Sequence, residues 1–362
     1  MFIVILLLLA FAAWFVPFRL QSLLGFGSLY AWIGTIIIIA LLALFPLLMR
    51  SAGDGESALI GVIYNIAAIF FMFFTYVFFA FLIEFILHPF LKQIIGWKIA
   101  SVAILIPFFV TLYGFINAQN FSVTNIEIPL KNLKSPVTFM HISDIHLGTQ
   151  RGEKYLQKII SLINEVKPDF VVYNGDLVDS NIALDENLFE LFKNVKSKQI
   201  FTIGNHEYYI DTQKVLELLR KNNIEILRNE SVEINGVQFI GLEYMNADLE
   251  TADSHRVNDL TVKDELPKME ISNSLPTILA HHTPQGAKYV AENGIDVMIS
   301  GHTHGGQVFP ANIIAKFRFP FVKGIHKIGD TTLIISQGAG TFGPMLRIGT
   351  NNEIQIIRLI PS

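Results

Sequence analysis

The N-terminal third of the chain is too apolar to fold as a water-soluble unit. Within a sequence of 362 residues, positions 1–120 hold only seven charged side chains: Arg19, Arg50, Asp54, Glu56, Glu84, Lys92 and Lys98. A bilayer-spanning helix needs about 20 mostly apolar residues, and four segments meet that requirement, at roughly 2–18, 29–49, 58–87 and 96–117. We therefore predict an all-α transmembrane anchor of about four helices over 1–117, followed by a polar linker over 118–135.

The sequence gives only weak evidence for which side of the membrane each end of this anchor faces. A cleaved signal peptide is the alternative for the first segment, but that segment has neither a basic start nor an Ala-x-Ala-like exit. Basic residues near the segment ends are balanced between the two sides, three against three. No basic residue precedes the first segment, which favours an outside N-terminus. With four spans, we expect a multi-pass protein of the cell membrane whose C-terminal domain is extracytoplasmic.

After residue 136 the pattern changes to alternating strands and helices. Apolar strand-like runs occur at 137–142, 170–173, 200–203, 277–280 and 296–299, and helical spacing occurs at 153–166 and 211–222. This alternation indicates a layered α/β domain over 136–362. The formal net charge of −4 gives no basic face for a nucleic-acid partner. The absence of cysteine excludes disulfides and thiolate metal sites.

Five short motifs place metal-binding side chains directly after predicted strands. They are Asp144-Ile-His146, Gly175-Asp176, Gly204-Asn205-His206-Glu207, His281 and Gly301-His302-Thr303-His304. In an α/β sheet, the carboxyl ends of the strands are where ligand sites form. Each motif alone has an ordinary structural interpretation, such as a loop hydrogen bond, a turn or a helix cap. Five of them at strand ends indicate one shared site.

The residue types indicate the chemistry of that site. Mixed Asp, Asn and His ligands suit divalent ions such as Mn²⁺, Fe²⁺ or Zn²⁺. A carboxylate such as Asp176 can bridge two ions about 3.5–4 Å apart, and such a pair activates a hydroxide for in-line attack on a phosphoryl group. The sequence therefore predicts a hydrolase that uses two divalent metal ions and needs no protein nucleophile.

At these residues the chain resembles the calcineurin-like metallophosphoesterase superfamily, and most closely its membrane-associated bacterial branch. The resemblance rests on SDIHLG, GDLVD, GNHE, LAHH and SGHTHGGQ in this order, and it extends over about 136–362 to the tail GAGTFGPMLRIG. It implies a four-layer αββα fold with two central mixed sheets. It also implies a binuclear metal centre and hydrolysis of phosphoester bonds.

The resemblance assigns a role to each motif residue. It implies a first metal held by Asp144, His146, Asp176 and His304, and a second held by Asp176, Asn205, His281 and His302. His206 is expected to act on the phosphate and protonate the leaving group. The strand-end position assigns the fourth motif to His281, with the adjacent His282 as the alternative.

Other polar residues have ordinary interpretations. Arg347 either pairs within the fold or orients a substrate phosphate, and the structural pairing is favoured. His141 lies inside a predicted strand, so a core position is expected. His88, His255 and His326 have no motif context and are expected to be structural or on the surface.

The leading hypothesis is thus a membrane-anchored phosphoesterase. A catalytically silent, membrane-tethered binding domain is the first alternative, and a transporter or channel with a regulatory phosphoesterase domain is the second. The sparse charge in the spans gives little support to a translocation path. The anchor suggests a phosphorylated substrate, including a lipid-linked or envelope molecule, and leaves open mono-, di- and pyrophosphate esters.

Overall fold

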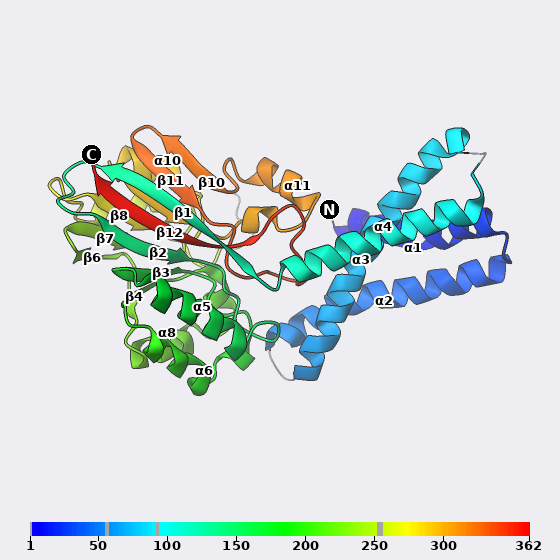
Figure 1. Ribbon diagram of the computed structural model, residues 1–362, viewed down its shortest axis with the longest axis horizontal. Helices are drawn as coiled ribbons and strands as arrows, with labels where there is room; N and C mark the ends of the chain where they lie inside the picture. The colour runs from blue at the N-terminus through cyan, green and yellow to red at the C-terminus, as the bar shows by residue number, and fades with distance from the viewer. Residues whose placement is uncertain (1, 55–57, 92–93, 252–255) are drawn as a thin grey trace.

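The computed structural model describes residues 2–54, 58–91, 94–251 and 256–362. Its N-terminal part contains four long helices, α1 (Phe2–Leu24), α2 (Ser28–Asp54), α3 (Ala58–Leu91) and α4 (Gly96–Asn117). Each is long and apolar enough to cross a bilayer. Figure 1 shows these helices beside the second, mixed α/β part of the molecule. The expected transmembrane region and the expected fold class are both confirmed.

Glu84 finds its counter-charges within the helical part. Its carboxylate accepts hydrogen bonds from the Arg19 guanidinium at 2.7 and 2.8 Å, and it lies 3.0 Å from the His88 ring. These contacts join α1 to the C-terminal half of α3. A buried carboxylate is costly unless it is paired, so the pair explains how Glu84 is tolerated in an apolar helix.

Two six-stranded sheets form the core of the α/β part. The first has the order β1-β12-β2-β3-β4-β5 and the second the order β10-β11-β9-β8-β7-β6. The strands of the first sheet are β1 (Phe121–Leu130), β2 (Val137–Ile142), β3 (Phe170–Asn174), β4 (Lys198–Thr202), β5 (Glu225–Ile226) and β12 (Asn352–Pro361). Those of the second are β6 (Glu230–Ile234), β7 (Val237–Gly241), β8 (Thr277–Ala280), β9 (Val297–Ser300), β10 (Gly324–Ile328) and β11 (Thr331–Ile335).

Side-chain alternation along the strands builds four layers. In β2, Phe139 packs between the two sheets, whereas the next residue, Met140, faces the helices on the outer side of the first sheet. Those helices are α5 (Glu153–Val166), α6 (Glu186–Glu190) and α8 (Thr212–Lys221). On the outer side of the second sheet lie α9 (Val262–Glu265) and α10 (Ala287–Glu292). The result is the expected αββα arrangement.

The segment 118–135, expected to be a linker, contains β1 instead. This strand pairs in parallel with β12 from Phe121↔Asn352 to Leu130↔Pro361. It lies at the sheet edge, so only alternate residues such as Ile126, Ile128 and Leu130 are buried. Most of its exposed residues, such as Ser122, Asn125 and Glu127, are polar, and that is why the segment has the composition of a linker. Pro129 is tolerated because an edge strand leaves one row of amides unpaired.

The membrane helices are therefore docked onto the α/β domain rather than loosely tethered to it. At the end of α4, the Asn117 amide donates to the carbonyls of Arg347 and Thr350 at 3.1 and 2.9 Å. The Arg347 amide in turn donates to the Gly114 carbonyl at 3.0 Å. On α3, the Tyr76 hydroxyl donates to the Phe309 carbonyl at 2.5 Å. Only residues 118–120 separate α4 from β1.

Candidate metal centre

The predicted ligands lie at the carboxyl ends of β2, β3 and β9, in unusual backbone conformations. Five of them have positive φ angles, which side chains other than glycine rarely adopt: Asp144 (54°), His146 (53°), Asp176 (52°), His302 (67°) and His304 (49°). Such backbone strain costs about 1–3 kcal/mol per residue and collects at functional sites. The fold holds these residues in place through hydrogen bonds between the loops, among them Asp144 N–H to Gly175 O and His146 N–H to Asp176 O, both 3.0 Å.

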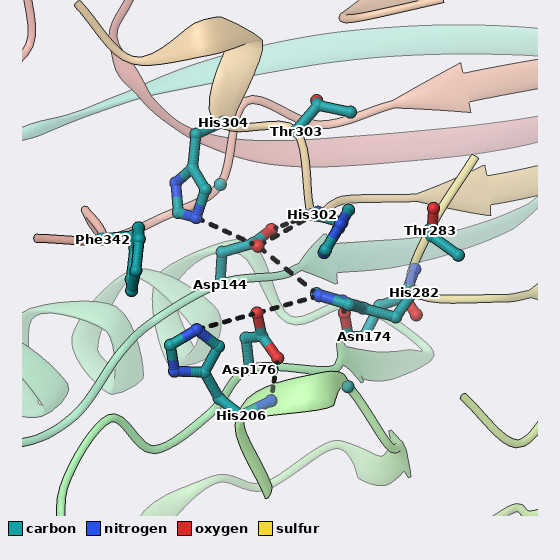
Figure 2. Close-up of polar contacts among 12 residues, drawn as sticks. Asp144, Asn174, Asp176, His206, His282, Thr283, His302, Thr303, His304 and Phe342 are labelled. Carbon is teal, nitrogen blue, oxygen red and sulfur yellow. Dashed lines mark hydrogen bonds and ion pairs between the residues drawn. The ribbon is translucent and has the colours of Figure 1, made fainter. Parts of the chain in front are cut away.

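Two buried carboxylates, Asp144 and Asp176, form the centre of the site. Figure 2 shows His206, His282 and His304 directed toward them. His304 Nε2 lies 3.4 Å from Asp144 Oδ1, and His282 Nε2 lies 3.0 Å from Asp176 Oδ2. The Asp144 carboxylate also accepts the His302 amide at 3.0 Å. Motifs from both sheets thus meet at one point, as the strand-end argument predicts.

At the fourth motif the structure places His282, not His281, at the centre. His282 has ligand atoms within 4.8 Å of those of Asp176 and His302, whereas His281 belongs to no such group among the described residues. His281 continues the line of β8, since its amide donates to the Ile299 carbonyl at 3.2 Å. Successive side chains of an extended chain point to opposite sides. The geometry therefore favours His282, the alternative, over His281 for the expected ligand position.

A carbonyl fixes the ring of His282. Its Nδ1 lies 2.7 Å from the Asn174 carbonyl, so Nδ1 carries the proton and Nε2 faces the carboxylates. Burial disfavours the charged imidazole, but Asp176 and Asp144 outweigh burial and raise the pKa of His282 to about 10. The same carboxylates would favour a divalent cation in place of that proton.

Asp179, which the sequence analysis did not single out, connects two of the histidines. Its Oδ1 lies 2.9 Å from His206 Nδ1 and 3.3 Å from His146 Nδ1. Burial alone would raise the pKa of Asp179, but hydrogen bonds from the two rings lower it to about 2. A sequence signal exists, because Asp179 is the last residue of the GDLVD motif.

Glu207 is a second residue to which the sequence motifs assigned no role. Its buried carboxylate accepts the amides of Gly204, Leu177 and Asp176 at 2.8, 2.7 and 3.1 Å. The Gly204 bond caps helix α7 (Asn205–Tyr209), so the N-cap is Gly204 and Asn205 is the first residue of the helix. The other two bonds tie the third motif to the second. Glu207 therefore holds the loop of Asp176 against the start of α7, where Asn205 lies.

Arg347 has a structural role, as favoured from the sequence. Its buried guanidinium donates to the carbonyls of His304, Gln337 and Gly340, each at 2.6 Å. Its Nη2 also lies 3.3 Å from His304 Nδ1. Because arginine can only donate, the acceptor His304 Nδ1 is unprotonated. Burial, His146 and Arg347 together hold the pKa of His304 well below its ordinary value. Arg347 thus orients the His304 ring.

The histidines outside the five motifs have structural or surface positions. His141 is a core histidine, with Nδ1 2.8 Å from the Gln355 amide oxygen and Nε2 3.1 Å from the Asn174 amide nitrogen. His326 lies on exposed β10, and His88 pairs with Glu84. His255 falls outside the described residues.

The remaining polar atoms fit a metal centre. Asn205 Oδ1 is buried without a hydrogen-bond partner, and so is His282 Nε2, apart from its ion pair with the carboxylates. A buried carbonyl oxygen without a partner is costly unless something else binds it. Three groups of ligand atoms lie within 4.8 Å of one another: Asp144, His146 and His304; Asp176, His282 and His302; and His146, Asp179 and His206. The first two groups contain the two buried carboxylates, Asp144 and Asp176.

Comparisons with known proteins agree with this geometry. The model of the calcineurin-like phosphoesterase family matches residues 137–306. An uncharacterized metallophosphoesterase of Campylobacter jejuni is 34% identical over 257 residues, which cover 68% of this chain and 66% of that protein. A transmembrane protein with metallophosphoesterase domain from Danio rerio is 32% identical, covering 71% of this chain and 62% of that one. An uncharacterized metallophosphoesterase of Aquifex aeolicus is 28% identical, covering 68% and 92%. The chain thus spans slightly less than two thirds of the first two relatives.

Proposed function

Because this chain belongs to the calcineurin-like phosphoesterase family, we propose that it is a membrane-anchored hydrolase that cleaves phosphoester bonds at a two-metal centre. The observation that carries the proposal is the convergence of Asp144, Asp176 and four histidines from both sheets on one point. The proposed domains are a helical anchor over 1–117 and a catalytic domain over 136–362, to which we add β1 because it pairs with β12. A silent binding domain would not need these strained ligand conformations, so we favour catalysis.

The proposed ligand sets share one carboxylate. Asp144, His146, Asp176 and His304 would hold the first ion, and Asp176, Asn205, His282 and His302 the second. Bound Mn²⁺, Fe²⁺ or Zn²⁺ would supply an activated water and neutralise phosphoryl charge. The protein's own part is to fix these ligands. Asn174 does so for His282, Arg347 for His304 and Glu207 for the loops of Asp176 and Asn205.

His206 is the proposed acid. Its Nδ1 is held by Asp179 at 2.9 Å, so the opposite nitrogen, Nε2, is directed to the carboxylate side, 4.0 Å from Asp176 Oδ2. A proton on Nε2 is positioned to pass to the leaving-group oxygen. The Phe342 and His206 rings meet edge to face with centroids 5.2 Å apart, so Phe342 also restricts the orientation of the His206 ring.

The proposed location is the cell membrane, with the catalytic domain extracytoplasmic. Helices α1 and α4 run beside each other in Figure 1, and the start of α1 lies at the same end as the catalytic domain. An even number of spans requires the N-terminus and the domain to lie on one side, and this arrangement supports that part of the proposal. A tether raises the local concentration of membrane substrates, so lipid-linked phosphoesters are the substrates we would examine first. Reporter fusions at residue 362 test the sidedness.

The test of function uses the full-length protein in lipid nanodiscs. Purified protein is incubated with Mn²⁺ and a panel of phosphomonoesters, phosphodiesters and lipid pyrophosphates, and a chelator is added in a parallel reaction. We expect hydrolysis of at least one class, lost with the chelator and restored by metal. His206→Ala is expected to retain metal and lose rate. Tight metal binding with no hydrolysis of any class would instead support the silent binding domain.

A further inference from the structure

Helix α11 (Ala311–Arg318) has an apolar face that the protein leaves uncovered. None of its side chains is buried. Ile313, Ile314 and Phe317 are spaced three and four residues apart, so they share one face of the helix. Phe317 is 88% exposed and Ile314 63% exposed. By contrast, α5 and α8 bury their apolar residues against the first sheet. Apolar side chains exposed together on one helix face indicate a binding surface.

The position of α11 shows which partner lies nearest. Figure 1 places it on the side of the catalytic domain that faces the membrane helices. The residue two places before it, Phe309, accepts the hydrogen bond from Tyr76 of α3. Ala311, its first residue, packs with Val308 and Leu346 in a cluster that includes Ile69 and Met72 of α3. The exposed face thus continues an existing contact with a membrane helix.

The charge of this segment fits a lipid surface. Residues 309–323, FPANIIAKFRFPFVK, contain three basic side chains and no acidic one. Lys316 is exposed beside Phe317, and the Arg318 guanidinium lies 5.9 Å from the Phe319 ring centroid. Aromatic and aliphatic residues on one face with basic residues at its margin are the composition of helices that lie in the membrane interface. Basic side chains there are attracted by anionic headgroups.

Both ends of α11 are connected to the metal centre. His304 precedes it by seven residues, and after its end the Phe319 ring lies 5.7 Å from the His302 ring. Between His304 and α11, the Gln307 amide donates to the Phe342 carbonyl at 2.8 Å, and the Phe342 ring contacts the His206 ring edge to face. The depth at which α11 lies in a bilayer therefore sets the depth of the catalytic residues.

We propose that α11 is an interfacial membrane helix whose Ile313, Ile314 and Phe317 insert among the lipids of the bilayer that α1–α4 span. The inserted face lies about 5–10 Å into the headgroup and acyl boundary. The metal centre is then held at the level of lipid headgroups. This surface rests on the membrane location of the four helices and not on the proposed hydrolysis, so the two can fail separately.

The experiment measures the depth of position 317 in the full-length protein. The chain has no cysteine, so Phe317→Cys gives a single site for an environment-sensitive fluorophore. Glu217→Cys on α8 is the matched control, because Glu217 is exposed and Figure 1 shows α8 on the side of the domain away from the helices. Both labelled proteins are placed in nanodiscs of mixed zwitterionic and anionic phospholipid. Each is titrated with iodide and compared with nanodiscs that contain nitroxide-labelled lipid.

We expect the label at 317 to lose emission to the lipid-borne nitroxide and to resist iodide, with the reverse at 217. Iodide quenching at both positions would overturn the proposal. Protection at 317 from both quenchers would also overturn it, because a second protein copy would then cover the face. If Phe317→Cys does not fold, the measurement is repeated at Ile314→Cys, which lies on the same face. A Lys316→Glu variant should shift the label toward iodide access in anionic nanodiscs only.

Discussion

Replacing Asp179 by Asn tests whether this carboxylate orients the proposed acid. Its Oδ1 faces Nδ1 of both His206 and His146, at 2.9 and 3.3 Å. An amide in this position can present its N–H to the ring instead of an acceptor, which favours the wrong tautomer of His206. The metals should remain, because none of the atoms in the two proposed ligand sets is changed.

The size of the effect follows from the pKa of Asp179. That pKa falls from 3.8 to about 2 through its contacts with the two histidines, against the effect of burial. Such a difference corresponds to roughly 2 kcal/mol of interaction. If this interaction is made with a protonated His206 in the transition state and not in the ground state, its loss slows hydrolysis about 30-fold. The upper limit is the full worth of general-acid catalysis, about 10²–10⁴-fold.

The assay compares two substrates with different leaving groups. For an alkyl phosphate, whose leaving group needs a proton, Asp179→Asn should lower kcat by about 30-fold or more. For p-nitrophenyl phosphate, whose leaving group is a weak base, the loss should be smaller. Asp185→Asn is the control, since Asp185 is a carboxylate six residues away that only caps α6 through the Asn187 amide. Equal losses for both substrates, or loss of metal, would refute the positioning role.

Three further substitutions test how the site is supported. Arg347→Met removes the donor to three buried carbonyls, so the free energy of unfolding should fall by about 3 kcal/mol or more. Thermal unfolding measures this change, and an unchanged midpoint would argue against the structural role of Arg347. Gly61→Val should destabilise the contact between α3 and the loop after His146, because a Cβ at position 61 lies 2.5 Å from Thr149 Cβ. We expect the free energy of unfolding to fall by about 1–3 kcal/mol. Gly152→Ala is the neutral control, because nothing lies within 4 Å of a Cβ at position 152. Glu207→Gln replaces one acceptor oxygen by a donor and leaves a buried amide unpaired. We expect the free energy of unfolding to fall by about 1–3 kcal/mol and metal binding to weaken in a calorimetric titration. Unchanged stability and unchanged metal affinity would show that Glu207 is dispensable.

Strong local patterns made much of the fold predictable. Runs such as Val137–Ile142 and Thr277–Ala280 are buried on both faces, so they are apolar throughout and easily recognised. The edge strand β1 was missed because its outward residues are polar, and its partner β12 is more than 200 residues away in sequence. Helix α11 lacks a polar–apolar pattern directed at the protein core, because nothing in the protein buries it.

The candidate site was predictable to the level of motifs but not of side-chain direction. Strand ends bring Asp144, Asp176 and His302 together, and that follows from topology. Which of His281 and His282 faces the centre depends on where β8 stops, and a boundary error of one residue reverses the answer. Asp179 contacts His146 and His206 from a loop in which Asp176 has a left-handed backbone conformation, and the residue pattern does not predict that conformation.

The central claim is a two-metal centre bridged by Asp176, with His282 as a ligand of the second ion. The most direct measurement is the metal content of the full-length protein after extensive dialysis, compared between His282→Ala and the neighbouring His281→Ala. We predict two ions per chain in the unaltered protein and in His281→Ala. One ion is expected in His282→Ala, with hydrolysis lost. Two ions in His282→Ala, or loss of an ion in His281→Ala, would contradict the account.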